Sequence, residues 1–210
     1  MLFAISGSQG SGKSTVMNSL RDRGFPVVER KTSRSIMEEW GVTLSEVNND
    51  RELTVKFQDE ILNRKFADEK QAALSPSTIW FTERTYADLF TYALIAIGKD
   101  NEYSKWLDEY YQRCMHYQAT YSHIFYLPAG KFKVQSDGVR GANGYYSKLV
   151  DRTMYSTTVE MAASVDAFTF ESTGPFVTKV LSSEVEHRTQ EILSHISEYF
   201  TKPKKLLEAE

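Results

Sequence analysis

The residue types best suited to chemistry lie near the start of the chain. The pattern G-x-x-x-x-G-K-S/T is matched there by Gly7-Ser8-Gln9-Gly10-Ser11-Gly12-Lys13-Ser14. In this pattern, backbone N–H groups surround phosphate oxygens, the lysine approaches the β- and γ-phosphates, and the serine hydroxyl is a ligand for Mg²⁺. The segment therefore predicts a site for ATP and Mg²⁺, in which residues from Gly7 to Thr15 hold the nucleotide and Ser14 contacts the metal.

The sequence on either side of this phosphate loop predicts the elements that hold it. Residues 2–5 are apolar and indicate a short buried strand, and Val16, Met17 and Leu20 give the next segment one apolar helical face. The phosphate would then face a helix N-terminus, where unpaired N–H groups and the helix dipole favour an anion. The alternative, a Gly/Ser-rich turn without a ligand, does not account for this strand–loop–helix setting.

The length of the chain is enough for one α/β domain with a substantial core. The chain has 210 residues, of which 41% are hydrophobic and 25% charged, and these values argue against disorder. We expect a single domain over residues 1–200 and a flexible tail over 201–210. The net charge of −3 argues against wholesale electrostatic binding to nucleic acid, although it leaves room for a local basic patch.

Cysteine use and hydropathy indicate a compartment. Cys114 is the single cysteine, which excludes an internal disulfide and fits a reducing environment. The sequence contains no signal-peptide pattern and no apolar run near 18 residues, so we expect no membrane partner and a cytoplasmic location. The oligomeric state stays open.

Apolar runs typical of strands alternate with helical patterns. Strands are predicted at residues 2–5, 25–28, 77–82, 122–127 and 167–170. Helices are indicated across residues 53–66, 89–97, 106–117, 145–163 and 183–199. This alternation predicts a parallel sheet with helices on both faces, and such sheets bind ligands at the carboxyl ends of their strands.

Charged residues follow three of these strands. They are Glu29-Arg30-Lys31-Thr32-Ser33-Arg34 after the second, Glu83-Arg84 after the third and Asp137-Gly138-Val139-Arg140 after the fourth, in a Gly-rich stretch. Phosphoryl transfer requires a metal, cations around the phosphates and a group that accepts the proton of the attacking hydroxyl. Glu83 is the candidate for Mg²⁺ or its waters, Arg84 for the transferring phosphate, Glu29 for the general base, and Arg140 for a cation that closes over ATP.

Each of these assignments has a structural alternative. Glu83 and Arg84 also suit a surface ion pair or a helix cap, and Glu29 can pair with its neighbour Arg30. Asp137-Gly138 is also a common turn. A separate aromatic group recurs at helical spacing, which favours packing in the core over stacking on a base. Its members are Tyr103, Trp106, Tyr110, Tyr111 and Tyr117.

Two of these motifs resemble those of a known group of enzymes. The segment from Phe81 to Asp88 resembles the Glu-Arg-Ser segment of deoxynucleoside kinases, with Thr85 in place of the serine. The segment from Asp137 to Arg140 resembles the Asp-Gly-x-Arg lid of nicotinamide riboside kinase-like proteins. Together with the phosphate loop, they make the chain similar to P-loop kinases of the nucleoside/nucleotide kinase group from Met1 to about Lys148.

The resemblance implies a fold and an activity. The fold is a five-stranded parallel sheet with helices on both faces and a lid over about residues 129–147. The activity is ATP-dependent transfer of the γ-phosphoryl group to a hydroxyl of a nucleoside or nucleotide, with Lys13, Glu29, Arg84 and Arg140 as catalytic residues. The chain departs from the group after the second strand, where Arg34 lies five residues beyond Glu29. Residues that contact nicotinamide have no counterpart that we can place, so that substrate is not carried over.

The nature of the acceptor depends on a cluster of cations. Arg30, Lys31 and Arg34 are either a solvated helix start or a site for phosphate on the acceptor. Three acceptors therefore stay open, namely a nucleoside, its monophosphate, and a hydroxymethylated pyrimidine in DNA. The last is an acceptor of phage relatives of this group, and a phage protein would act in the host cytoplasm. The candidates for contacting the acceptor are Glu29, Arg30, Arg34, Glu83 and Asp137.

Another class of protein stays as an alternative. A P-loop ATPase or GTPase would hydrolyse its nucleotide without a small-molecule acceptor. The GTPase patterns Asp-x-x-Gly and Asn-Lys-x-Asp are absent from the sequence, which has Glu83-Arg84-Thr85-Tyr86 after the third strand.

The general-base assignment can be tested directly. We expect Glu29→Gln to lower kcat far more than it raises KM for ATP, because it removes the proton acceptor and leaves the phosphate loop intact. Steady-state kinetics with ATP and an acceptor that the wild-type protein phosphorylates measure both constants. An unchanged kcat would show that another group accepts the proton.

Overall fold

The computed structural model describes residues 1–28, 33–130, 144–169 and 175–201, with side chains for all of these except 165–169 and 198–201. Glu29, Arg30, Lys31, Asp137 and Arg140 lie outside the described residues. In chain order the elements are β1 (Leu2–Ser6), α1 (Lys13–Asp22), α2 (Ser33–Trp40), α3 (Leu44–Asn49), α4 (Arg51–Ala73), β2 (Trp80–Glu83), α5 (Tyr86–Ile97), the 3-10 helix η1 (Asn101–Tyr103), α6 (Ser104–Gln118), β3 (His123–Tyr126), α7 (Gly144–Thr169), β4 (Phe176–Lys179) and α8 (Val185–Thr201).

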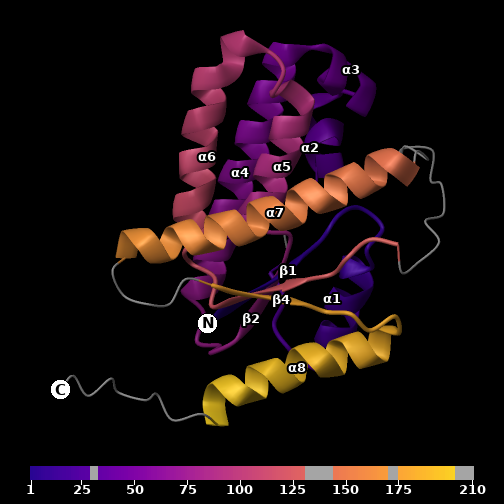
Figure 1. The fold of residues 1–210 in the computed structure, drawn as a ribbon, viewed down its shortest axis with the longest axis vertical. Coiled ribbons are helices and arrows are strands. Elements are labelled where there is room, and N and C mark those ends of the chain that lie inside the picture. The colour runs from indigo at the N-terminus through magenta and orange to yellow at the C-terminus, as the bar shows by residue number, and fades with distance from the viewer. Residues whose placement is uncertain (29–32, 131–143, 170–174, 202–210) are drawn as a thin grey trace.

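The strands form one parallel sheet in the order β2-β1-β3-β4. In β1, Phe3 and Ile5 pack with α1 and α8 on one face, whereas Ala4 packs with α4, α5, α6 and α7 on the other. This alternation follows from the two-residue period of a strand. Figure 1 shows α8 on one side of the sheet and α4, α5, α6 and α7 on the other. The predicted parallel sheet with helices on both faces is confirmed.

The prediction of five strands was wrong for the described residues, which contain four. Residues 25–28 form no strand, and only Val27 makes an isolated parallel bridge, to Phe81. The backbone N–H of Val28 donates to the carbonyl of Phe81, and the N–H of Phe81 donates to the carbonyl of Pro26. Pro26 has no N–H of its own, so it cannot extend this pairing.

The last predicted strand was also wrong, because residues 167–169 continue α7. A helix gains one backbone hydrogen bond for each added residue, so a long helix readily continues over a few residues of mixed propensity. The strand that completes the sheet is β4, which was not predicted. As an edge strand it is only partly buried, and it therefore lacks the continuous apolar run of a central strand.

The aromatic residues of α6 pack in the core, as their spacing favoured. Tyr110 is buried and its ring stacks on that of Trp106. The ring of Tyr117 stacks on that of Phe66 from α4, with centroids 4.2 Å apart. The contact between Phe66 and Tyr117 joins α4 to α6. Across the described part of the chain, no helix has the length and apolar character needed to cross a membrane.

The buried side chain of His123 in β3 should make the free energy of unfolding depend on pH. Burial, together with the nearby His195, lowers the pKa of His123 from 6.5 to about 4. The folded protein thus prefers the neutral ring, so this contribution to stability is complete above about pH 6.5 and is lost as pH falls toward 4. The loss amounts to about 2 to 3 kcal/mol.

We expect His123→Gln to reduce this slope, because glutamine keeps a polar group near the Thr178 hydroxyl, which the ring contacts at 2.8 Å, but does not titrate. Urea unfolding of both proteins between pH 4 and 7 measures the difference. Identical slopes for the two proteins would assign the pH dependence to other groups.

Candidate functional site

The phosphate loop connects the carboxyl end of β1 to the N-terminus of α1. Gly7 has a φ of 142° and Gly12 a φ of 89°, values that side chains disfavour. A β-carbon on Gly7 would also overlap the carbonyl oxygen of Leu127, directly after β3. Gly12 is the N-cap of α1 and offers no side-chain cap, so the first backbone N–H groups of α1 face the loop. The structure therefore has the strand–loop–helix setting that the pattern predicted.

The loop folds around the ammonium group of Lys13. This side chain is only 5% exposed, and its Nζ donates to the carbonyl oxygens of Gly7 at 2.7 Å and Ser8 at 2.9 Å. A positive charge thus lies against two backbone carbonyl groups of the loop. Gln9 and Thr15 are exposed at the edge of the same loop. The arrangement is electrostatically suited to a polyphosphate.

Ser14 and Glu83, the two predicted metal ligands, lie side by side. The hydroxyl of Ser14 donates to the Glu83 carboxylate at 3.2 and 3.3 Å, although 69 positions separate them in the chain. Glu83 is the last residue of β2, which pairs with β1 and so ends beside the loop. A hydroxyl and a carboxylate are the hard oxygen donors that Mg²⁺ prefers, so these residues fit the metal.

Arg84 follows Glu83 in a left-handed conformation, with a φ of 68°. Its backbone N–H donates to the carbonyl of Ile5 at 2.8 Å, and its guanidinium lies over the ring of Tyr92, 5.2 Å from the centroid. The helix cap at this point is Thr85, whose hydroxyl accepts from the backbone N–H of Asp88. The cap is thus made one residue later, and Arg84 does not serve as the cap.

Tyr92 lies between Arg84 and the phosphate loop. Burial raises the pKa of its hydroxyl, while the Arg84 guanidinium and a hydrogen bond with the backbone of Gln9 oppose this rise. The phenol therefore stays neutral at physiological pH. It contributes a polar group to the wall that separates the loop from the neighbouring helices.

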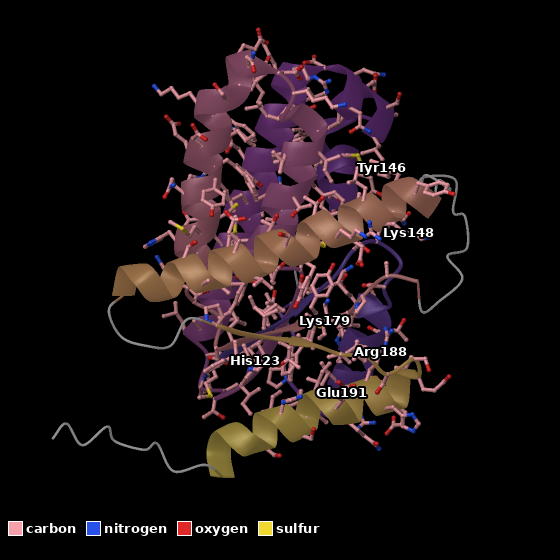
Figure 2. All side chains as sticks on the ribbon, in the orientation of Figure 1. His123, Tyr146, Lys148, Lys179, Arg188 and Glu191 are labelled. Atoms are coloured by element: carbon pink, nitrogen blue, oxygen red, sulfur yellow. The ribbon has the colours of Figure 1, made fainter. Side chains whose placement is uncertain are left out.

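A cavity of about 430 Å³ opens beside this wall, among α2, α3, α4, α5 and the first turn of α7. Gln9 of the loop, Arg84 and Tyr92 belong to its lining, and Tyr146 contributes from the end of α7 labelled in Figure 2. The rest combines apolar side chains with amides and a cation, among them Val47, Phe57, Leu89, Asn48, Gln58 and Arg51. Arg51 also forms an ion pair with Asp100 at 2.8 Å.

Sequence reasoning missed most of these cavity residues. Apolar residues at helical spacing look the same whether they line a cavity or fill a core, so Phe57 and Leu89 carried no distinguishing signal. Arg34, a predicted acceptor contact, is exposed on α2 and does not line the cavity, although its neighbour Ser33 does. No metal-binding group of three or more His, Cys, Asp or Glu side chains occurs among residues with described positions.

Asp151 on α7 ties that helix to the phosphate loop. Its carboxylate accepts hydrogen bonds from the Ser8 hydroxyl at 3.0 Å, the Tyr126 hydroxyl at 2.9 Å and the backbone N–H of Ala129 at 3.0 Å. Burial, followed by the charge of Asp151, raises the pKa of Tyr126. No motif surrounds Asp151, so the sequence offered no sign of this role.

Arg188 supports the loop from the opposite face of the sheet. It is fully buried, with its Nη1 donating to the carbonyl of Ser11 at 2.6 Å and its Nε to the carbonyl of Ser182 at 2.5 Å. Figure 2 shows Arg188 on the sheet side of α8. Its burial lowers the pKa of the guanidinium. The C-terminal third of the chain thus holds part of the nucleotide loop, although its sequence matches no motif.

Comparison with protein families gives one match. The family model AAA_28, described as an AAA domain, matches residues 2–167. No curated protein matches the sequence.

Comparison with solved structures gives several similar folds. The NadR protein in complex with NR superposes with a TM-score of 0.61 at 12% identity, over 98% of this chain and 51% of that one. Deoxyadenosine kinase from M. mycoides with bound dATP gives 0.62 at 16% identity, over 94% and 99% of the two chains. Shikimate kinase from Acinetobacter baumannii in complex with shikimate gives 0.55 at 13% identity, over 96% and 95%.

These likenesses establish a fold. The chain has the α/β fold of P-loop kinases, as the motifs predicted. It spans about half the length of the NadR chain that it matches.

The close approach of Gly7 to Leu127 yields a test of the loop. We expect Gly7→Ala to lower the free energy of unfolding by about 2 to 4 kcal/mol, because alanine suffers both an unfavourable φ and an overlap with a backbone carbonyl. Gly144→Ala is the matched control, since a β-carbon there meets nothing within 4 Å. Chemical denaturation of both variants measures the effect, and equal stabilities would contradict the described loop.

Proposed function

The chain belongs to the AAA-domain family whose model spans residues 2–167, and we propose that it is an ATP-dependent kinase that phosphorylates a hydroxyl of a nucleoside or nucleotide-type acceptor. One observation carries this proposal. The cavity of about 430 Å³ shares Gln9 with the phosphate loop and includes Arg84 in its lining. A compartment for an organic molecule therefore adjoins the place where the γ-phosphate would lie.

The contacts between the phosphate loop and the cavity support a separate role for each residue. Lys13 and the first N–H groups of α1 hold the β- and γ-phosphates, and Ser14 and Glu83 hold Mg²⁺. When bound, Mg²⁺ supplies positive charge that offsets the negative charge developing on the phosphates. Arg84 lies at the cavity wall, where its guanidinium stabilises the phosphoryl group during transfer.

The reaction joins the acceptor hydroxyl oxygen to the γ-phosphorus and breaks the bond from that phosphorus to the β–γ bridging oxygen, which releases ADP. The hydroxyl proton passes to a base. We assign this role to Glu29, which follows the segment bridged to β2. We assign to Arg140 the role of a positive charge that approaches ATP from the lid region. Both residues are assigned from the sequence.

The lining of the cavity favours a ring with a polar edge. Phe57 and Leu89 offer apolar surface, and Asn48 and Gln58 offer amides that both donate and accept hydrogen bonds. The names of the similar structures fit this view, since they include a deoxyadenosine kinase and a complex with NR. A nucleoside is therefore our first choice of acceptor.

Two other acceptors keep a specific basis. Arg51 in the lining, and Arg30 and Lys31 shortly before the lining residue Ser33 in the sequence, suit an acceptor that already carries phosphate. A nucleoside monophosphate and a hydroxymethylated pyrimidine in DNA both meet this description. The AAA description of the family also keeps an ATPase without an acceptor as the alternative from another class.

The central test measures ADP release with a panel of acceptors. We expect release to require an acceptor, and we expect Lys13→Ala to reduce it at least a hundredfold, because the variant loses the charge beside the β- and γ-phosphates. Labelled ATP with free nucleosides, monophosphates and hydroxymethylated DNA provides the measurement. ADP release that is independent of every acceptor indicates an ATPase, and near wild-type kcat in Lys13→Ala overturns the kinase proposal.

A further inference from the structure

Two charged side chains of α4 are buried beneath the end of β2. Lys65 is 1% exposed and Glu69 is 4% exposed, and the two form an ion pair one helical turn apart. Removing two charges from water is expensive, and apolar residues at such positions are often equally stable or more so. Stability alone therefore does not explain why this pair is buried.

The hydrogen bonds of the pair lead to the strand that carries the site. Nζ of Lys65 donates to the hydroxyl of Thr82 at 3.1 Å and to the carbonyl oxygen of Glu83 at 3.4 Å. The same Thr82 hydroxyl donates to Glu69 at 2.6 Å. The pair thus binds both the side chain and the backbone of the last two residues of β2.

Glu69 is in turn held by two tyrosines. Tyr86 donates to its carboxylate at 2.6 Å, and the Tyr121 hydroxyl lies 3.2 and 3.3 Å from its two oxygens. The ammonium of Lys65 lies over both rings, 5.3 and 5.9 Å from their centroids. Burial and the charge of Glu69 raise the pKa of both phenols, which therefore remain hydrogen-bond donors. Glu69 is thus fixed in position by groups from α5 and from the segment before β3.

The carbonyl of Glu83 belongs to the peptide unit that precedes Arg84. The orientation of this peptide helps to set the left-handed φ of 68° at Arg84, a conformation that is unfavourable for a residue other than glycine. A hydrogen bond to the carbonyl on one side and the bond from the Arg84 N–H to Ile5 on the other hold the peptide at both ends. These two hydrogen bonds help to hold Arg84 in its unfavourable left-handed conformation.

We propose that Lys65 and Glu69 are positioning residues of the active site. They hold the Glu83 carboxylate beside Ser14 for Mg²⁺ and direct the Arg84 side chain to the cavity wall. This inference rests on the proposed function for its catalytic meaning. Its structural content is separate, because it concerns how firmly the Mg²⁺ ligand Glu83 is held.

The test measures how much Mg²⁺ tightens the binding of AMP-PNP, an ATP analogue that is not hydrolysed. The variant Lys65→Met/Glu69→Met removes both charges together and leaves neither one unpaired. We expect its affinity for AMP-PNP without Mg²⁺ to stay within threefold of wild type, whereas its gain on adding Mg²⁺ falls at least tenfold. Isothermal titration calorimetry with and without Mg²⁺ measures both quantities.

The chain offers a matched control on the same helix. Glu60 and Arg64 form an ion pair at 2.5 Å with the same four-residue spacing, but both side chains are partly exposed, and Arg64 also pairs with the exposed Glu39 of α2 at 2.8 Å. Glu60→Gln/Arg64→Met should leave the Mg²⁺-dependent gain unchanged, whereas a general effect of losing an α4 ion pair would reduce it in both variants and overturn the proposal. A folded Lys65→Met/Glu69→Met protein with the full gain would overturn it equally.

A second variant decides the question if the double variant does not fold. Thr82→Val keeps the ion pair and the bond from Lys65 to the Glu83 carbonyl, but removes the hydroxyl through which both charged side chains contact β2. We expect the Mg²⁺-dependent gain to fall at least threefold. The full gain in Thr82→Val would contradict the proposal. These binding measurements need no acceptor. A wild-type protein that phosphorylates no acceptor would therefore refute the proposed function, whereas the positioning role would still be decided by the calorimetry.

Discussion

The backbone of the phosphate loop depends on a close approach that only glycine permits. Gly7 follows β1 with a φ of 142° and lies against the carbonyl of Leu127, so the loop is in close contact with the residue that follows β3. This contact directs the chain back toward α1, whose first N–H groups then face the phosphate site. The other site residues lie around this short segment. Ser14 belongs to α1, Glu83 ends β2, and Arg84 follows it.

Three polar side chains connect distant parts of the fold to the site, of which Lys65 and Arg188 are buried and Asp151 is partly buried. Asp151 links α7 to Ser8, Arg188 links α8 to Ser11, and Lys65 links α4 to the carbonyl of Glu83. Buried polar groups are expensive unless they are hydrogen-bonded, and these side chains all make such bonds to the loop or to the strand beside it. Because hydrogen bonds are directional, they restrict the site geometry more than apolar packing would. Two of these helices, α4 and α7, also line the cavity, so the phosphate site and the cavity share these two supports.

Local signals in the sequence predicted the residues that need a particular backbone or a particular strand end. Gly7, Lys13 and Ser14 follow from one short pattern, and Glu83 follows from its place after an apolar strand. Their juxtaposition could be predicted because parallel strands end at one edge of the sheet. The strand at Phe176–Lys179 could not, since an edge strand has no apolar run that distinguishes it.

The amino-acid sequence sufficed to predict a nucleotide loop, a parallel sheet with helices on both faces and the pairing of Ser14 with Glu83, because these depend on local pattern and on sheet geometry. It did not predict the cavity, or the roles of Lys65, Asp151 and Arg188. A cavity exists only once several helices have packed, and a buried charge is recognised only from its partners, which lie up to 177 positions away along the chain. Such partners share no local pattern, so only the folded chain brings them together.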